Sequence, residues 1–394
     1  MAATFPYQEF MDRVARRFAS DQTIRIPPGE YVDPVNASVN MLTVVEANTR
    51  VQICSDSRAW LRVPEHTGTA ILPPMWKIQI GDRSTLTIDH IGLVGLGNRA
   101  GMSITLGVGA ELILDSLDVT GCNQVGLQVR AVKGNGARVL IRNCVCNGDY
   151  TDAVRTMGYG TNLIDLQEAD IIGGTMEGYK HGVAVSGSWF GRVCVSHADL
   201  GANPKAGFYA LGLRVHGTEG NLVEVMQCDI PGGIEVSGGK NVLISGNYVS
   251  RHYASTGGNG PAISINQQWS GMRKVEIANN LITGGYIGMA VRNVVPSQLA
   301  YLGILGNIIR PANPPTKPMV NGIQVFGDAR DNHYLNIDRY EHYCNTILDT
   351  RGPYSLSRPY AINKLVSGWD MVGTAADMEI GGPNYGPRKT VVLP

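Results

Sequence analysis

A guanidinium, an imidazole and a carboxylate occur close together in the sequence, at Arg214, His216 and Glu235. Arginine can bind a carboxylate through two parallel hydrogen bonds, while histidine and glutamate can take up and release protons near neutral pH. We therefore predict that these three residues form a catalytic group acting on a carbohydrate. The alternative is a solvated sheet face on which Arg214 and Glu235 make an ordinary cross-strand pair.

Five further polar residues are predicted to bind the substrate around this group. Their side chains can donate hydrogen bonds to sugar hydroxyls or carboxylates. They are Arg130, His181, Ser237, Asn266 and Arg292. His181 also follows Tyr179 and Lys180, so this segment could place a base beside a charge-neutralising cation, as a lyase requires. A solvated turn is the alternative there.

Few carboxylates accompany the predicted catalytic group, and this limits the reactions that it could catalyse. A glycosidase needs two carboxyl groups about 5–10 Å apart, but Glu235 stands alone. Other acidic pairs occur at Asp149 with Asp152 and at Glu168 with Asp170, where solvated turns explain them equally well. The sequence therefore leaves catalysis open.

A repeat must position these residues. The tetrad glycine-apolar-x-apolar recurs at intervals of 21 to 34 residues. This count takes the proline-led PAISI at Pro261 as one of the tetrads. It also takes a single gap of 56 residues as two coils, one of which is degenerate around Asn162. The glycines are Gly101, Gly126, Gly182, Gly212, Gly233, Gly288 and Gly322. A period of this length is typical of a solenoid, whose units bury their apolar faces only by stacking.

A second run of alternating residues follows each tetrad by about ten positions. Alternation with a period of two predicts strands, and the Gly, Asn and Asp residues between runs predict turns. Aligning the runs brings Asn247, Asn280 and Asn307 into one column, about 4.8 Å apart on successive coils. Their amides are expected to hydrogen-bond along the stack, and asparagine there would also tolerate left-handed backbone angles.

These asparagines, the glycine-led tetrads and the segment RIPPGEY (Arg25–Tyr31) resemble the right-handed parallel β-helix family of pectate-lyase-like proteins, over roughly residues 20–345. RIPPGEY looks like the opening strand of many phage tailspikes and polysaccharide-processing β-helices. The resemblance implies an all-β, right-handed, single-stranded parallel β-helix. We expect a capping helix and first strand in residues 1–32, the solenoid in 33–345, and an irregular tail in 346–394 that caps the end or contacts another protomer.

The N-terminal segment is predicted to cap the solenoid. Phe10, Val14 and Phe18 would lie on one face of a helix over residues 5–19, with charged residues opposite. An open solenoid end exposes core and strand edges, so it needs such a cover. Attachment to a larger assembly is the alternative.

Bulk properties exclude some partners. The 394 residues carry a formal net charge of zero, so we expect no nucleic acid partner. No apolar stretch reaches the roughly 20 residues of a membrane span, and the first residues lack the apolar core of a signal peptide. The seven cysteines lack zinc-site spacing, so we expect buried small hydrophobes, no metal and no cofactor.

Three functions are compatible with these observations. The first is a tailspike-like virion protein, extracellular and homotrimeric, that recognises and could also cleave a cell-surface polysaccharide. The second is a bacterial extracellular polysaccharide lyase, epimerase or fructan transferase, although the clustered aspartates of pectin hydrolases and the calcium-binding carboxylates of pectate lyases are missing. The third is a non-catalytic structural or decoration protein of a virus particle.

An apolar stripe on the second strand of the repeat favours contact between protomers. It would be exposed on an isolated shaft, and an apolar stripe of this kind suggests a partner surface. Its members are Leu140, Met226, Leu243 and Leu305. Coverage by the C-terminal tail is the alternative.

Overall fold

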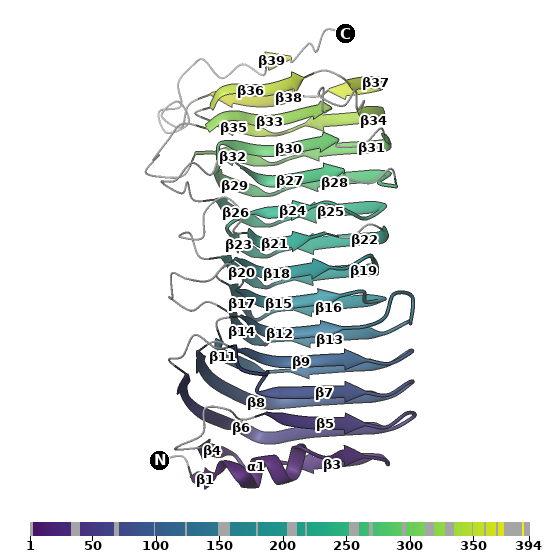
Figure 1. Ribbon diagram of the computed structural model, residues 1–394. Helices are drawn as coiled ribbons and strands as arrows, with labels where there is room; N and C mark the ends of the chain where they lie inside the picture. The colour runs from purple at the N-terminus through teal and green to yellow at the C-terminus, as the bar shows by residue number, and fades with distance from the viewer. Residues whose placement is uncertain are drawn as a thin grey trace. The chain divides into compact units, whose positions relative to one another are not determined.

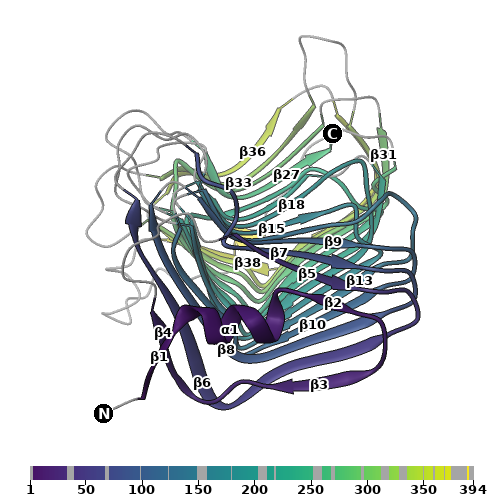
Figure 2. The same ribbon diagram turned by 60° about the horizontal axis from the view of Figure 1, so that its bottom comes forward.

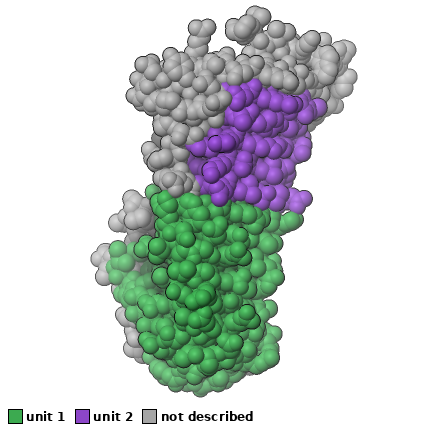
Figure 3. Space-filling view, turned by 90° about the vertical axis from the view of Figure 1, so that its right-hand side faces the viewer, with its two compact units in different colours: residues 1–206 green, residues 207–394 purple. Residues whose placement is uncertain are grey.

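The computed structural model is built almost wholly of parallel strands, with a single helix among the described residues. It describes residues 3–389 except 33–39, 67–70, 98, 123, 149–157, 179, 203–210, 217–218, 252–259, 268–270, 294–296, 312–318, 328–334, 349, 358–359, 368 and 374–387. The chain divides into two compact units (Figure 3), unit 1 over residues 1–206 and unit 2 over residues 207–394. Each unit is a right-handed parallel β-helix.

Each coil of unit 1 crosses three walls of strands (Figure 1). The first wall contains β2 (Arg17–Phe18), β5 (Met41–Val45), β7 (Trp76–Ile80), β9 (Ala100–Leu106), β12 (Val125–Arg130), β15 (Tyr159–Ile164) and β18 (His181–Ser186). The second contains β3 (Gln22–Arg25), β6 (Arg50–His66), β8 (Thr85–Gly97), β10 (Glu111–Asp115), β13 (Arg138–Arg142), β16 (Glu168–Ile172) and β19 (Trp189–Ser196). The third contains β1 (Thr4–Pro6), β4 (Gly29–Val32), the far ends of β6 and β8, β11 (Asp118–Cys122), β14 (Val145–Gly148), β17 (Thr175–Gly178) and β20 (Asp199–Ala202).

The core of unit 1 follows from side-chain alternation. In β7, Trp76, Ile78 and Ile80 are buried and the two residues between them are exposed. A strand alternates its side chains between faces, so every coil places apolar residues directly above those of the previous coil. The degenerate coil predicted around Asn162 is present, because Asn162 pairs in register with Gln128 below and Ala184 above.

The N-terminal helix is shorter than predicted. Helix α1 covers Tyr7–Val14 rather than residues 5–19, and it buries Phe10 and Val14. Phe18 is buried too, but it belongs to β2, where it pairs with Val45. Strand pairing with the next coil ends the helix early, since Phe18 can reach the core from a strand. Figure 2 shows α1 lying across the end of the first coils, as expected for a cap.

Unit 2 repeats the three-wall plan (Figure 1). Its first wall contains β21 (Leu211–Val215), β24 (Ile234–Val236), β27 (Pro261–Gln267), β30 (Ile287–Asn293), β33 (Met319–Gly327) and β36 (Thr350–Ser357). The second contains β22 (Glu219–Met226), β25 (Asn241–Ser245), β28 (Lys274–Ala278), β31 (Ser297–Leu305), β34 (Leu335–Tyr343) and β37 (Tyr360–Ser367). The third contains β23 (Asp229–Pro231), β26 (Tyr248–Arg251), β29 (Leu281–Gly284), β32 (Ile308–Arg310), β35 (Thr346–Leu348) and β38 (Trp369–Gly373), and β39 (Arg388–Lys389) pairs antiparallel with β38.

Parallel pairing continues beyond the boundary predicted at residue 345. Strands β36, β37 and β38 pair in register with β33, β34 and β35 of the preceding coil. The sequence conceals this coil because its tetrad starts with proline. Asn321 pairs with Gly352, which places Pro353 where the previous coil has Gly322. Part of the predicted irregular tail is thus a further coil.

A buried asparagine ladder runs through unit 2 and is longer than predicted. It contains Asn247, Asn280, Asn307 and Asn345, and it ends at Asp370. The Nδ2 of each asparagine donates twice. The Oδ1 of Asn280, Asn307 and Asn345 accepts from the backbone N–H and the Nδ2 of the asparagine one coil below, whereas the Oδ1 of Asn247 accepts from the backbone N–H of Cys228. Asn280, for example, accepts from Asn247 N at 3.0 Å and Nδ2 at 2.9 Å. It donates to Ile244 O at 3.0 Å and to Asn307 Oδ1 at 2.9 Å.

Asp370 closes the ladder by its chemistry. A carboxylate only accepts hydrogen bonds, so it can satisfy the coil below without needing an amide above. Its Oδ1 accepts from Asn345 N at 2.8 Å and Nδ2 at 3.1 Å, and its Oδ2 lies 2.8 Å from Nδ1 of buried His342. Sequence reasoning placed this residue in the irregular tail and missed its role.

The left-handed backbone angle expected of the ladder residues belongs to the residue before each. Asn280 follows Asn279, which has φ 57°. The corresponding turn residues of both units share this conformation: Ser116, Asn143, Gly173, His197, Gln227, Gly246, Asn279, Gly306 and Cys344. The turn thus requires positive φ at one residue and leaves the next free to point inward.

Candidate functional site

Six predicted site residues lie together on the outer face of the first wall of unit 2, and we call them the polar array. They are Arg214, His216, Glu235, Ser237, Asn266 and Arg292. Strand register explains the grouping. Glu235 pairs with Arg214 on one side, and Asn266 pairs with Arg292. Inward neighbours such as Leu213 are buried, which points the alternate residues outward.

His216 and Ser237 belong to the same column of the array. Val215 pairs with Val236, and the backbone N–H of Ser237 donates to Val215 O at 2.8 Å. His216 and Ser237 are the residues that follow Val215 and Val236, so they occupy equivalent positions on successive coils. With Asn266 and Arg292 they form a column of four residues, spaced by about 4.8 Å per coil.

Arg214 and Glu235 form the cross-strand ion pair that the sequence analysis gave as the alternative to a catalytic group. Arg214 Nε lies 3.2 Å from Glu235 Oε1, and the two side chains are 34% and 23% exposed. A pair with this exposure adds about 1 kcal/mol or less to stability. Its importance is positional, because it fixes a cation and an anion beside His216.

Two polar atoms of the array are buried and lack a protein partner among the described residues. They are Nδ1 of His216 and Oγ of Ser237. A buried polar atom without a hydrogen bond costs about 1–3 kcal/mol, so these two atoms lower the stability of the coils that carry them. Burial lowers the pKa of His216, and the neighbouring Arg214 lowers it further against the opposing effect of Glu235. The imidazole is therefore neutral at pH 7 and can act as a base.

Asn266 and Arg292 are joined to each other and differ in exposure. Asn266 is buried, and its Oδ1 accepts hydrogen bonds from Arg292 Nε and from Ser264 Oγ. Arg292 itself is exposed. The buried amide thus orients a guanidinium whose remaining donors face solvent.

Sequence reasoning missed Arg251. This residue ends β26, is 8% exposed and donates a hydrogen bond to Pro261 O. Burial lowers its pKa to about 10, while Glu235 acts in the opposite direction. It therefore stays charged at neutral pH and adds a second cation near Glu235. Gly260 makes room for it, since a Cβ there would lie 2.8 Å from its Cζ; this glycine was the available signal.

Two predicted binding residues lie in unit 1 and do not belong to the array. Arg130 is exposed at the end of β12. His181 in β18 is 1% exposed, and its ring centre lies 5.4 Å from that of Tyr159. Of the other candidates, Asp170 forms an ion pair with Arg192 at 2.8 Å. Asp149, Asp152 and Tyr179 lie outside the described residues.

The predicted apolar stripe is less open than expected. Leu140, Met226, Leu243 and Leu305 are half-buried. Greater exposure occurs on the third wall of unit 2, where Tyr248 is 41% and Ile308 is 44% exposed. Leu281 pairs with both, so these residues form a separate stripe across three coils.

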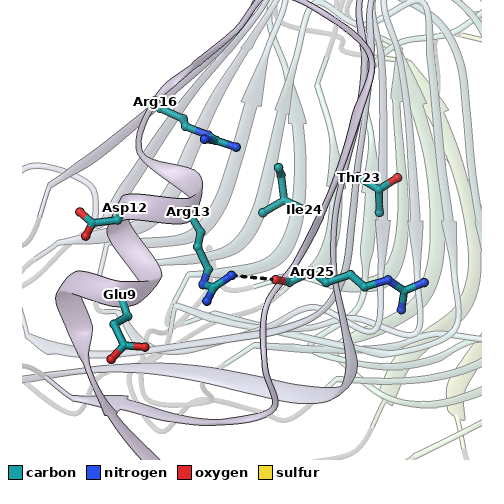
Figure 4. Close-up of a pocket in the computed structure, with 7 residues that line it drawn as sticks. All are labelled: Glu9, Asp12, Arg13, Arg16, Thr23, Ile24 and Arg25. Carbon is teal, nitrogen blue, oxygen red and sulfur yellow. Dashed lines mark hydrogen bonds between the residues drawn. The ribbon is translucent and has the colours of Figure 1, made fainter.

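A cleft among the described residues lies elsewhere, in unit 1, and contains none of the predicted site residues. It has a volume of about 430 Å³ and lies between α1 and β3 (Figure 4). Its lining is Glu9, Asp12, Arg13, Arg16, Thr23, Ile24 and Arg25. Figure 4 shows Arg13 reaching across to the backbone oxygen of Arg25, at 3.4 Å. The lining combines two acidic and three basic side chains.

Metal-site and membrane features can be assessed for the described part of the chain. There, no group of three or more His, Cys, Asp or Glu side chains could hold a metal ion. No helix in that part has the length and apolarity of a membrane span. All seven cysteines are free thiols; six are buried, and Cys344, contrary to expectation, is exposed.

Comparisons with known proteins give low similarity. No protein-family model matches the chain, and no curated protein matches its sequence. Among solved structures, the periplasmic alginate epimerase AlgG is 10% identical with a TM-score of 0.40, over 87% of this chain and 85% of that one. The A-module of mannuronan C-5 epimerase AlgE6 from Azotobacter vinelandii is 13% identical with a TM-score of 0.34, over 89% and 91%.

The surface protein and adhesin PfbA of Streptococcus pneumoniae is also similar, with 9% identity and a TM-score of 0.37 over 89% of this chain and 91% of that one. Similarities at this level carry no argument about activity. The parallel β-helix fold of this chain rests on its own strand register.

Proposed function

We propose that this protein recognises a cell-surface polysaccharide, in the manner of a tailspike, through the polar array of unit 2. The supporting observation is a column of polar residues on successive coils, in which His216 is half-buried and Arg292 is exposed. A sugar hydroxyl both donates and accepts hydrogen bonds, so it can bind their exposed atoms. The exposed guanidinium of Arg292 adds a site for a sugar carboxylate.

The spacing of the array suits a chain molecule. Successive residues of the column are separated by one coil, about 4.8 Å, which is comparable with one sugar residue of an extended polysaccharide. The cations Arg214, Arg251 and Arg292 outnumber the single carboxylate of Glu235. We therefore propose an acidic polysaccharide, whose carboxylates approach this side of unit 2.

Polysaccharide lyase or epimerase activity is the second candidate, and the neutral imidazole of His216 favours it. A base next to a cation can remove the proton from the carbon beside a bound carboxylate. In a lyase the electron pair then forms a C=C bond, the glycosidic C–O bond breaks, and the leaving oxygen takes a proton. In an epimerase a proton returns to the opposite face. Arg214 would bind the carboxylate as negative charge develops on it.

A glycan panel tests both proposals. Acidic and neutral polysaccharides are assayed for binding by calorimetry and for the ultraviolet absorbance of an unsaturated product. We expect an acidic glycan to bind, and Arg292→Ala to weaken it about 10-fold or more, as loss of a charge-assisted pair implies. Arg310→Ala is the matched control, because Arg310 is an exposed arginine on the third wall of the same unit.

The outcomes separate the candidates. Absence of binding to every glycan would reject polysaccharide recognition. Binding that Arg292→Ala and Arg310→Ala weaken equally would reject the array as its location. Binding without a new product would support recognition alone, whereas a product that disappears in His216→Gln would support the lyase or epimerase.

The tailspike proposal also includes a homotrimer on a virion or in the extracellular space. The stripe of Tyr248, Leu281 and Ile308 supports an interface, because exposed apolar residues on successive coils are covered in side-by-side packing. Light scattering after gel filtration tests it. A trimer has three times the chain mass of 42.3 kDa; a monomer at micromolar concentration would contradict it.

A further inference from the structure

The proposed function does not use the cleft between α1 and β3. Its volume of about 430 Å³ is large enough for a small molecule. Three arginines contribute to its lining, namely Arg13, Arg16 and Arg25. Guanidinium groups match the geometry of carboxylates and phosphates, so the cleft has the composition of an anion site.

Two of these three arginines carry a charge that no carboxylate compensates. Arg25 is paired, because its Nη1 lies 2.8 Å from Asp56 Oδ1. Arg13 and Arg16, in contrast, form no ion pair with any residue that the structure describes. Both side chains are exposed, so a ligand in solvent can reach them.

Neutral groups hold both of these guanidiniums in place. Arg13 donates to the backbone oxygen of Arg25 at 3.4 Å, at the end of β3. Arg16 donates to Gln22 Oε1 at 3.4 Å, at the start of β3, and its Cζ lies 4.9 Å from the centre of the Phe18 ring. A carbonyl and an amide orient a guanidinium without cancelling its charge, and most of its five N–H donors remain available.

The two acidic residues of the lining limit the kind of anion that fits. Asp12 accepts a hydrogen bond from Gln8 Nε2 at 2.7 Å, and Figure 4 shows it on the side of α1 that points away from Ile24. Glu9 lies at the other end of the cleft from Arg16 in the same view. Their negative charges would repel a polyanion, so the lining favours a small ligand with one oxyanion group.

We propose that this cleft binds a small molecule through one oxyanion group, a carboxylate or a phosphate, held by the guanidiniums of Arg13 and Arg16. Each guanidinium can offer two parallel N–H donors to such a group. The half-buried side chain of Ile24 provides an apolar surface for the rest of the ligand. The site belongs to unit 1, so it does not depend on polysaccharide recognition by unit 2.

Calorimetric titration of the full chain tests the proposal. Sodium phosphate and sodium acetate are titrated separately at constant ionic strength, and we expect saturable binding of at least one of them. Arg13→Gln and Arg16→Gln should each weaken it about 10-fold or more, because each removes a charge-assisted pair. Arg50→Gln should leave it unchanged, since Arg50 is exposed on β6 of the same unit and lies outside the cleft.

The two titrations also distinguish the sources of the oxyanion. Binding of phosphate alone would assign a phosphorylated ligand, binding of acetate alone would assign a carboxylic acid, and binding of both would support a site open to either. Absence of saturable binding for both anions would overturn the proposal. Equal weakening by Arg13→Gln, Arg16→Gln and Arg50→Gln would also overturn it.

A crystal structure with the bound anion gives a second readout that needs no variant. Density for the anion should lie at hydrogen-bonding distance from Arg13 and Arg16, and this decides the question if either variant fails to fold. Density only at other arginines would contradict the proposal. Density in the cleft without saturable binding in solution would mark an adventitious ion only and would equally reject the site.

Discussion

The turn between the second and third walls has the same backbone in both units but different inward side chains. Unit 1 places Leu117, Cys144, Gly174 and Ala198 after the left-handed residue. Unit 2 places Cys228 there in its first coil and asparagine in the next four, at Asn247, Asn280, Asn307 and Asn345. In both, the carbonyl of this residue accepts from the next coil, as in Val145 N to Leu117 O and Leu281 N to Asn247 O, at 2.8 and 2.9 Å.

The difference shows two ways to fill one geometry. Unit 1 uses close packing, to the extent that a Cβ at Gly174 would lie 2.1 Å from Cys144 O. Unit 2 uses amides that satisfy one another and the inward backbone N–H groups. The ladder links coils that also carry the polar array, so hydrogen bonds inside fix the spacing of polar residues outside.

The largest expected effect comes from interrupting the ladder. Asn280→Leu fills the space but removes four hydrogen bonds, those of the Asn280 side chain with Asn247 N, Asn247 Nδ2, Ile244 O and Asn307 Oδ1. At about 1 kcal/mol for each buried hydrogen bond, we expect a loss of about 3 kcal/mol or more. Urea unfolding measures it.

The matched change in unit 1 is Cys144→Ala. It removes one buried sulfur that donates only weakly, so we expect a loss of about 1 kcal/mol. Equal losses for the two variants would show that the amides add nothing beyond packing, and the comparison of the two turns would fail.

A smaller effect is expected from pH, through His216. Its folded pKa lies below the unfolded value of 6.5. Between these two values the unfolded chain binds more protons, so this residue makes stability fall as pH drops below about 6.5. Above that pH it contributes no slope.

The pH dependence is read from unfolding free energies between pH 5 and 8, a window of about three units centred on the histidine pKa. His216→Gln should flatten the decline on the acid side. A His216→Gln curve parallel to that of the wild type would mean that the imidazole is not held neutral by its surroundings.

The smallest expected effect is a difference in the reactivity of cysteine thiols between the two units. Burial raises the pKa of Cys144 in unit 1 to about 12, so its reactive thiolate is scarce. Cys344 in unit 2 is exposed. We expect one of the seven thiols to react rapidly with a disulfide reagent in the native protein and all seven after denaturation. Several rapid native thiols would contradict the described packing.

The sequence predicted what repetition encodes. The three asparagines found by alignment do stack, and Arg214 and Glu235, placed on adjacent coils by the repeat, form an ion pair. Asp370 escaped because its coil begins with Pro353 instead of glycine. Asn345 belongs to the coil of Gly322, and it escaped because the run before it, LNIDRYEHY in β34, contains many polar residues. The predicted helix extended to Phe18 because Phe18 fits the helical spacing of Phe10 and Val14. In the structure Phe18 is buried from the strand that follows the helix.

The burial of residues that do not repeat from coil to coil could not be predicted from the sequence, for a physical reason. Arg251 and Arg99 occur once each, with no periodic neighbour, and their burial arises only when coils close around them. Likewise, the sequence placed Ser237 and Asn266 on an open face, but both are buried. The column to which a residue belongs follows from its position in the repeat. Its exposed fraction depends on how the whole coil packs around it.

The most direct test of polysaccharide recognition is a crystal structure with a bound acidic oligosaccharide. The account predicts sugar along the column of His216, Ser237, Asn266 and Arg292, with its carboxylate at the exposed guanidinium of Arg292. Sugar bound only in the cleft between α1 and β3, with the array empty, would contradict it.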